Sequence, residues 1–135
     1  MTIPGFTDHA ITLAGQDIAY STGGSGPPLL LLHGFPQTRA MWARIAPELA
    51  KTHSVICPDL RGYGASGKPR DVSAYSFRAM AEDMRLLMAH LGFDHFAVAG
   101  HDRGGRVTHR LALDAPQCVT RACVMDIVPT HTLLS

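Results

Sequence analysis

The sequence predicts an α/β fold in which a mostly parallel β-sheet carries helices on both faces. Short, fully apolar runs alternate with segments of helical periodicity along most of the chain. The apolar runs lack a polar face, which is typical of strands buried on both sides. With 135 residues, 46% of them hydrophobic, the chain fits one compact domain or part of a larger one.

The first elements are expected to be a hairpin and a buried strand. Ile11–Leu13 and Asp17–Ser21 flank the turn-forming segment Ala14-Gly15-Gln16 and predict two paired strands. Leu29–Leu32 is apolar throughout and predicts the first inner strand, which ends at His33-Gly34.

A helix, a strand and a long loop are expected next. Thr38 can cap a helix that runs to about Lys51. Ser54–Cys57 predicts the second inner strand, which Pro58 ends. Asp59–Arg70 contains three glycines and is expected to be a loop.

The following segment predicts the longest helix. Ser76 can cap it, and Gly92 can end it just after Leu91. Its apolar residues recur at helical spacing at Met80, Met84, Leu87 and Leu91. Phe96–Ala99 predicts the third inner strand.

The residues after this strand predict a turn, a helix and a further strand. Gly100–Gly105 is expected to be a sharp turn, followed by a helix over Arg106–Ala115 that Pro116 stops. Val119–Met125 predicts a further strand. Because functional groups collect at the carboxyl ends of such strands, the polar residues there are the first candidates for a site.

Composition excludes several classes of partner. The chain has 12 basic and 11 acidic residues, a balance that argues against a nucleic-acid or membrane-surface protein. No apolar run approaches the length of a membrane span, and the start of the chain does not resemble a signal peptide. Three cysteines without CxxC spacing predict buried reduced thiols, no metal site and a cytoplasmic protein. No cofactor is expected.

One strand-turn-helix segment carries a candidate nucleophile. Gly100 and Gly104 flank Asp102 two positions before and two after, which is the G-x-nucleophile-x-G elbow with Asp in place of Ser. A carboxylate at a helix N-terminus stays ionised and can attack saturated carbon to form an enzyme ester. The alternative is that Asp102 merely caps the helix.

Four motifs occur in order along the chain: HGFPQ (His33–Gln37), DLRGYGAS (Asp59–Ser66), GHDRGGRV (Gly100–Val107) and MDIVPT (Met125–Thr130). Together they resemble motifs of the α/β-hydrolase superfamily, and most closely those of its haloacetate (fluoroacetate) dehalogenases. Epoxide hydrolases and haloalkane dehalogenases share HGFP and the Asp elbow, but they usually carry Trp after the nucleophile. This chain has Arg103 there.

The resemblance implies a role for five residues. Asp102 would be the nucleophile that displaces halide from the α-carbon of a 2-haloacid, the expected small-molecule substrate. Arg103 and Arg106 would bind the substrate carboxylate, as two guanidinium groups on one helix face can. The backbone N–H groups of Phe35 and Arg103 would form the oxyanion hole. Asp126 would be the acidic triad member that orients the general-base His.

Two further residues are expected to be structural. His33 would orient its loop through hydrogen bonds, and Arg61 would hold the DLRG turn rather than a ligand.

The chain departs from the family's pattern in its length. The general-base His lies near the C-terminus in the family, and none of the eight His here has a matching context; His131 is in the wrong segment. The cap domain and the last strands are also missing. We therefore expect residues 1–135 to be the N-terminal, incomplete part of an α/β-hydrolase core domain, inactive when isolated.

The function expected of the full-length parent is hydrolytic dehalogenation of haloacetates. An epoxide hydrolase, or a non-catalytic fragment, remains the alternative. An uncovered sheet edge can pair with another chain, so a homodimer also stays open.

Overall fold

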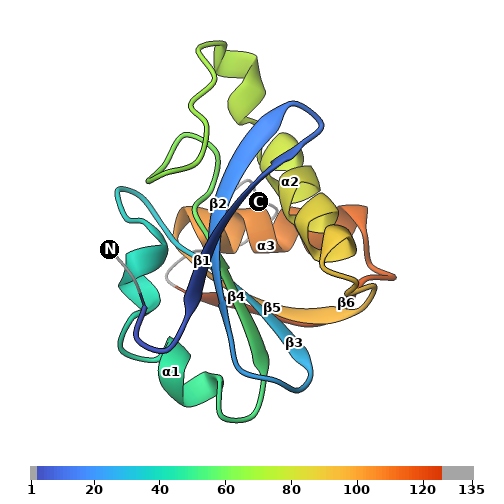
Figure 1. The fold of residues 1–135 in the computed structure, drawn as a ribbon. Helices are drawn as coiled ribbons and strands as arrows, with labels where there is room; N and C mark the ends of the chain where they lie inside the picture. The colour runs from blue at the N-terminus through green and yellow to red at the C-terminus, as the bar shows by residue number, and fades with distance from the viewer. Residues whose placement is uncertain (1–2, 126–135) are drawn as a thin grey trace.

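The computed structural model describes residues 3–125, which form a six-stranded sheet with helices on both faces (Figure 1). The strand order is β1-β2-β4-β3-β5-β6. The strands are β1 (Thr7–Leu13), β2 (Gln16–Gly23), β3 (Pro28–Leu32), β4 (Ser54–Pro58), β5 (Phe96–His101) and β6 (Val119–Met125). Strands β4, β3, β5 and β6 pair in parallel, whereas β1 pairs with β2, and β2 with β4, antiparallel. The predicted mostly parallel sheet is thus confirmed.

The helices form two layers. They are η1 (Arg39–Trp42), α1 (Ala46–Leu49), η2 (Val72–Tyr75), α2 (Phe77–His90) and α3 (Arg103–Asp114). Helices α2 and α3 pack on one face of the sheet, with the larger apolar cluster beneath them. The pair η1 and α1 packs on the other face over a second apolar cluster. Helices on both faces were expected from the sequence, and the structure confirms them.

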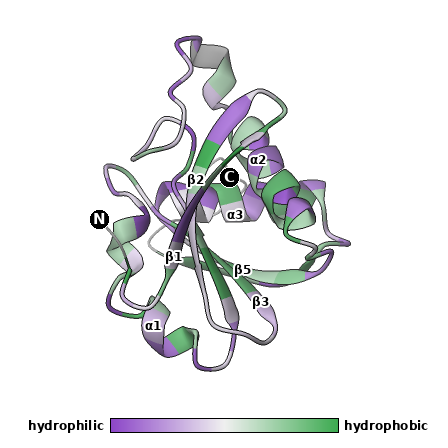
Figure 2. Cartoon of the chain, in the orientation of Figure 1, coloured by the Kyte–Doolittle hydropathy of each residue, from purple (hydrophilic) through white to green (hydrophobic). Residues whose placement is uncertain are grey.

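Strand β3 shows why the inner strands are apolar throughout. Leu30 and Leu32 belong to the cluster under α2 and α3, whereas Leu31 belongs to the cluster on the opposite face. Successive side chains of a strand point to opposite sides, so a strand covered on both sides needs apolar residues at every position. Figure 2 shows the hydrophobic inner strands, whereas the edge strand β1 is hydrophilic at its start and more hydrophobic toward its end.

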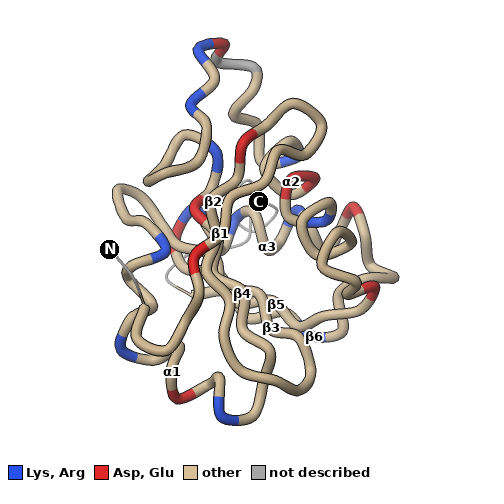
Figure 3. Tube along the Cα trace, viewed as in Figure 1, with Lys and Arg blue, Asp and Glu red and all other residues tan. Residues whose placement is uncertain are grey.

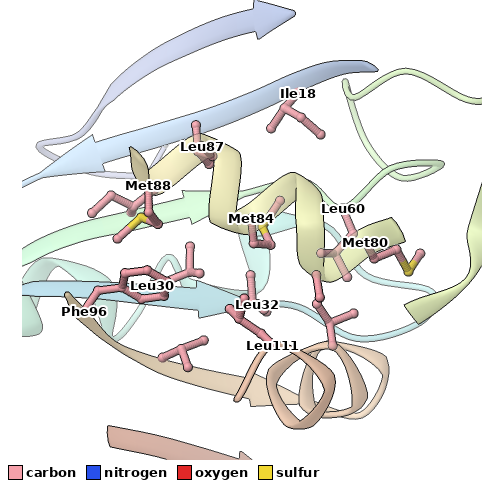
Figure 4. Close-up of a cluster of buried hydrophobic side chains, with 14 of the residues drawn as sticks. Ile18, Leu30, Leu32, Leu60, Met80, Met84, Leu87, Met88, Phe96 and Leu111 are labelled. Atoms are coloured by element: carbon pink, nitrogen blue, oxygen red, sulfur yellow. The ribbon is translucent and has the colours of Figure 1, made fainter. Parts of the chain in front are cut away.

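Helix α2 supplies much of the larger cluster. Its buried apolar residues lie one helical turn apart and face the sheet, as Figure 4 shows. They are Met80, Ala81, Met84, Leu87 and Met88. The Ser76 hydroxyl caps this helix by accepting a 3.0 Å hydrogen bond from the Ala79 N–H, and Gly92 follows its end with φ +86°. The predicted start and end of the helix are therefore close to those observed.

The predicted continuous helix from Thr38 to Lys51 is wrong. Thr38 does cap a helix, but that helix is the short 3₁₀ segment η1, and α1 begins separately at Ala46. The cause is Pro47, which lacks an N–H and whose ring would meet the carbonyl of residue 43 in an unbroken helix. A proline in the first turn of a new helix meets neither difficulty.

Other differences from the sequence-based expectations are smaller. The 3₁₀ helix η2 was not predicted, and α3 begins at Arg103, three residues before the predicted start. The expectation of buried thiols holds for Cys57, whose pKa burial raises to about 12. Cys118 is half-buried and Cys123 is exposed on β6, although all three are free thiols.

Two further observations concern the surface. Within residues 3–125, none of the helices is both long enough and apolar enough to cross a bilayer. Basic and acidic residues are interspersed along the chain in the view of Figure 3.

At the junction of β5 and α3, backbone packs closely against backbone. A methyl group on Gly100 would overlap the Gly104 carbonyl in the first turn of α3. A methyl group on Gly104 would overlap the carbonyl oxygens of Leu32 and His33 at the end of β3. Neither glycine has a positive φ, so both are required by close approach rather than by backbone conformation. The positive φ, +53°, belongs to Asp102 between them.

We expect Gly104→Ala to destabilise the protein by about 1–3 kcal/mol, because the added methyl pushes α3 away from β3. Helix propensity alone predicts the opposite sign, a gain of about 1 kcal/mol for Gly to Ala within a helix. Denaturant unfolding of the variant measures the difference. Leu113→Ala, on the exposed side of the same helix, is the control and should change stability by less than about 0.5 kcal/mol. A stabilised Gly104→Ala variant would show that the contact is not tight.

Candidate active site

Asp102 lies between the end of β5 and the first residue of α3, with φ +53° and ψ −115°. Its side chain makes no capping hydrogen bond to the helix. Instead, carboxylate oxygen Oδ2 accepts a 3.0 Å hydrogen bond from the backbone N–H of Phe35. The backbone is held on both sides, since the Asp102 N–H donates to the Met125 carbonyl at 3.0 Å and its carbonyl accepts from the Arg106 N–H at 3.1 Å. The capping role considered from the sequence is therefore not what this geometry shows.

The surroundings of Asp102 keep its carboxyl group ionised. The hydrogen bond from the Phe35 N–H lowers the pKa of Asp102, and the Arg103 N–H acts in the same direction. Partial burial opposes this shift, and the nearby Arg103 charge supports it. The pKa stays below its ordinary value, so a carboxylate with one oxygen held and the other available is present at neutral pH.

The loop that supplies the Phe35 N–H is fixed by His33. This imidazole is fully buried, with Nδ1 2.9 Å from the Gly34 carbonyl and Nε2 accepting a 3.0 Å hydrogen bond from the Leu60 N–H. A ring nitrogen that accepts is unprotonated, so Nδ1 carries the hydrogen and donates it to Gly34. Burial lowers the pKa of His33, which keeps the ring neutral. This is the orienting role that the motif led us to expect.

Gly34 brings the loop and the elbow into contact. A Cβ at this position would lie 2.7 Å from the Asp102 Cβ and 2.9 Å from the His101 carbonyl. A side chain here would therefore displace the Phe35 N–H from the carboxylate.

A buried ion pair holds the far end of the same loop. Asp59 is 1% exposed; its Oδ1 accepts a 2.8 Å hydrogen bond from the Arg39 N–H, and its Oδ2 pairs with the Arg39 guanidinium. The Ala65 N–H also donates to Asp59 Oδ2, at 2.9 Å. Sequence reasoning missed this pair, because partners 20 residues apart carry no local signal.

Arg61 is bound within the protein, as expected. Its Nε and Nη2 donate to the two oxygens of Asp83 on α2, each at 2.7 Å, and its Nη1 donates to the Ala74 carbonyl at 2.6 Å. The hydrogen bond to Asp83 raises the pKa of Arg61. With its donors engaged, this guanidinium connects the DLRG turn to α2 and is not placed to bind a ligand.

Arg103 and Arg106 differ from Arg61 in having no such partner. Both lie in the first turn of α3, next to Asp102; Arg103 is exposed and Arg106 half-buried. No carboxylate among residues 3–125 forms an ion pair with either.

The Arg103 guanidinium lies over the Phe35 ring, 5.1 Å from its centroid. Arg110, two turns along, instead pairs with Asp114 at 2.7 Å. The helix turn that follows the candidate nucleophile thus carries two arginines without an ion-pair partner among residues 3–125.

The remaining predicted site residue, Asp126, lies outside the described residues, as does His131. Within residues 3–125, no group of three or more His, Cys, Asp or Glu side chains is arranged to hold a metal ion. The structure therefore brings together Asp102, Phe35, Arg103 and Arg106, and the proton-transfer partners remain predictions.

Comparison with known proteins identifies the family. A family model for the alpha/beta hydrolase fold matches residues 27–134, so the chain belongs to the α/β-hydrolase family. A crystal structure of the Nostoc sp. PCC 7120 protein ALR0039 matches with a TM-score of 0.95 and 46% identity, covering 98% of this chain and 47% of that one. A crystal structure of an epoxide hydrolase from Vigna radiata matches with a TM-score of 0.89 and 26% identity, covering 93% and 41%.

Two curated relatives differ in activity. The chain is 54% identical to a fluoroacetate dehalogenase of Burkholderia sp. over 132 residues, which are 96% of this chain and 43% of the relative. It is 44% identical to a soluble epoxide hydrolase of Corynebacterium sp. (strain C12), over 91% of this chain and 42% of the relative. The chain thus spans less than half the length of these relatives.

We expect the stability of the protein to fall as pH drops through and below about 6.5, partly because of His33. The unfolded state binds a proton at this ordinary His pKa, whereas burial lowers the pKa of folded His33. The contribution of neutral His33 is therefore complete above pH 6.5 and is lost toward the folded pKa. Unfolding free energies measured at pH 7.5 and 5.5 test this. His33→Gln should be less stable at both pH values but should show a smaller difference between them. An unchanged difference would contradict a neutral, buried His33.

Proposed function

We propose that the protein containing this chain is a hydrolytic dehalogenase that converts a 2-haloacid, such as a haloacetate, to the 2-hydroxyacid and halide. The observation that carries this proposal is an ionised Asp102 followed in the first turn of α3 by two arginines that have no ion-pair partner among residues 3–125. A small substrate with a carboxylate would pair with these guanidinium groups. The 54% identity to a fluoroacetate dehalogenase supports the same substrate class.

In the first step, Asp102 attacks the substrate. Because Oδ2 is held by the Phe35 N–H, the other oxygen, Oδ1, is the nucleophile. It forms a bond to the α-carbon while the carbon–halogen bond breaks, and the halide leaves with the electron pair. Arg103 and Arg106 hold the substrate carboxylate and offset its repulsion from the Asp102 carboxylate.

In the second step, water hydrolyses the enzyme ester. Water attacks the carboxyl carbon of Asp102, and negative charge develops on Oδ2, beside the N–H groups of Phe35 and Arg103. Collapse of this intermediate releases the 2-hydroxyacid and restores the carboxylate. We propose that Asp126 orients the His that accepts the proton of this water and then gives it to the departing alkoxide oxygen, as the family resemblance implies.

An epoxide hydrolase is the second candidate, because a soluble epoxide hydrolase is 44% identical to the chain. The same Asp102 could open an epoxide ring. A neutral epoxide, however, carries no carboxylate to pair with Arg103 and Arg106, so this reading gives the two arginines no role. Their contribution to substrate binding separates the two candidates.

The ester intermediate predicts where water oxygen enters. In a single turnover of chloroacetate in H₂¹⁸O, the label should appear in the carboxyl group of Asp102 and not in the product hydroxyl. Mass spectrometry of the peptide containing Asp102, and of the product, measures both. Label in the product alone would show direct attack by water. Asp102→Ala should lower halide release at least about a thousandfold.

The two arginines predict a difference between charged and neutral substrates. Arg103→Gln and Arg106→Gln should each raise KM for chloroacetate about tenfold or more, the expected effect of losing a hydrogen bond to a charged group. Steady-state kinetics with chloroacetate and with a neutral epoxide measure the contrast. Arg110→Gln, on the same helix but paired with Asp114, is the matched control. Turnover of epoxides alone, insensitive to the two substitutions, would favour the second candidate.

A further inference from the structure

We propose that Phe35 is a positioning residue for Arg103. Its aromatic ring holds the Arg103 guanidinium by a cation–π contact and leaves the N–H donors of that guanidinium free to bind an anionic substrate. This inference rests on the proposed function, in which Arg103 binds a carboxylate. It assigns a second role to Phe35, separate from that of its backbone N–H.

The exposure of Phe35 is the first observation. Phe35 is 58% exposed, unlike the buried aromatic residues Trp42 and Phe96. The exposed ring lies under the guanidinium of Arg103, whose central carbon is 5.1 Å from the ring centroid. This separation is within the range of a cation–π attraction.

The Phe35 ring is itself held in place by a second aromatic ring, that of Tyr63. Tyr63 meets the Phe35 ring edge-on, with centroids 6.3 Å apart and an interplanar angle of 80°. Tyr63 also meets the buried His33 ring at 5.2 Å and 71°. Edge-to-face contacts at these separations are attractive and orient both rings. A chain of three rings therefore connects the Arg103 guanidinium to the fixed imidazole.

The kind of contact matters for binding. A guanidinium has five N–H donors at its edge, and a carboxylate partner uses them, as Asp83 does with Arg61. The face of an aromatic ring attracts the charge through the π-system and leaves edge donors available. Phe35 thus restricts Arg103 without neutralising it, which lowers the ordering cost of pairing with a substrate carboxylate.

Phe35 also connects the two groups that would contact the substrate, the Asp102 carboxylate and the Arg103 guanidinium. The N–H of Phe35 holds one oxygen of Asp102, and the ring of the same residue holds the cation. The distance between the nucleophile and the carboxylate-binding group is therefore set by one residue on one rigid loop.

The test is a comparison of Phe35→Leu and Phe35→Trp in the full-length protein. Both variants keep the backbone N–H, but only Trp keeps an aromatic face. For chloroacetate, Phe35→Leu should raise KM about two- to fivefold, the range expected for an exposed cation–π contact, with a smaller change in kcat. Phe35→Trp should retain the wild-type KM. Equal losses in the two variants, or a loss confined to kcat, would overturn the proposal.

A double-mutant cycle shows whether the ring acts through Arg103. In an Arg103→Gln background, Phe35→Leu should have no further effect on KM, because the cation is already gone. An undiminished effect would mean that the ring contacts substrate directly and would contradict the positioning role.

A spectroscopic measurement separates this inference from the proposed function. Guanidinium and δ-methylene protons of Arg103 that lie over the ring should show upfield ring-current shifts, which Phe35→Leu abolishes and Phe35→Trp keeps. Failure of the wild-type protein to release halide would refute the dehalogenase proposal, while these shifts would still report the contact. Unshifted Arg103 protons in an active protein would refute the cation–π contact alone.

Discussion

The first turn of α3 rests directly on the backbone at the end of β3, and the candidate site depends on that contact. Because Gly104 carries no side chain, the helix approaches the carbonyl oxygens of Leu32 and His33. The approach brings Asp102 within hydrogen-bond distance of the Phe35 N–H. It also imposes a left-handed φ on Asp102, a conformation that costs a non-glycine residue about 1–3 kcal/mol and persists only where the surroundings enforce it.

Buried polar groups supply that enforcement from the opposite side. His33 forms hydrogen bonds with two backbone groups, the Gly34 carbonyl in its own loop and the Leu60 N–H in the turn after β4. Asp59, in that same turn, accepts a hydrogen bond from the Arg39 N–H, which lies beyond the other end of the His33 loop. An unsatisfied polar atom in such a place costs about 1–3 kcal/mol, so each partner strongly resists displacement. The two loops consequently behave as one rigid support for the residue that contacts Asp102.

The sequence predicts best those features of the structure that depend on residues close together in the chain. The apolar run at Leu29–Leu32 predicts a strand buried on both faces, and the structure confirms it, because such burial requires apolar residues at successive positions. The glycine frame around Asp102 predicts a sharp turn; the turn is present, but the two glycines are required by close backbone approach, and the unusual φ belongs to Asp102. The interruption at Pro47 follows from equally local chemistry, but the expected helix from Thr38 to Lys51 rested on the cap at Thr38 and did not take this proline into account. The Arg39–Asp59 pair and the ring contacts of Phe35 were not foreseeable, since they join loops whose relative placement exists only in the folded chain.

The elbow separates positions that cannot vary from positions that can. At Gly100 and Gly104 almost any side chain collides with backbone, whereas the side chains of Arg103 and Arg106 project from the same turn without supporting it. Substitution at 103 or 106 can therefore change the charge presented to a ligand while leaving in place the glycine contacts that position the nucleophile. Such a scaffold is evolvable: new substrate preferences can arise by single mutations that carry little penalty in folding.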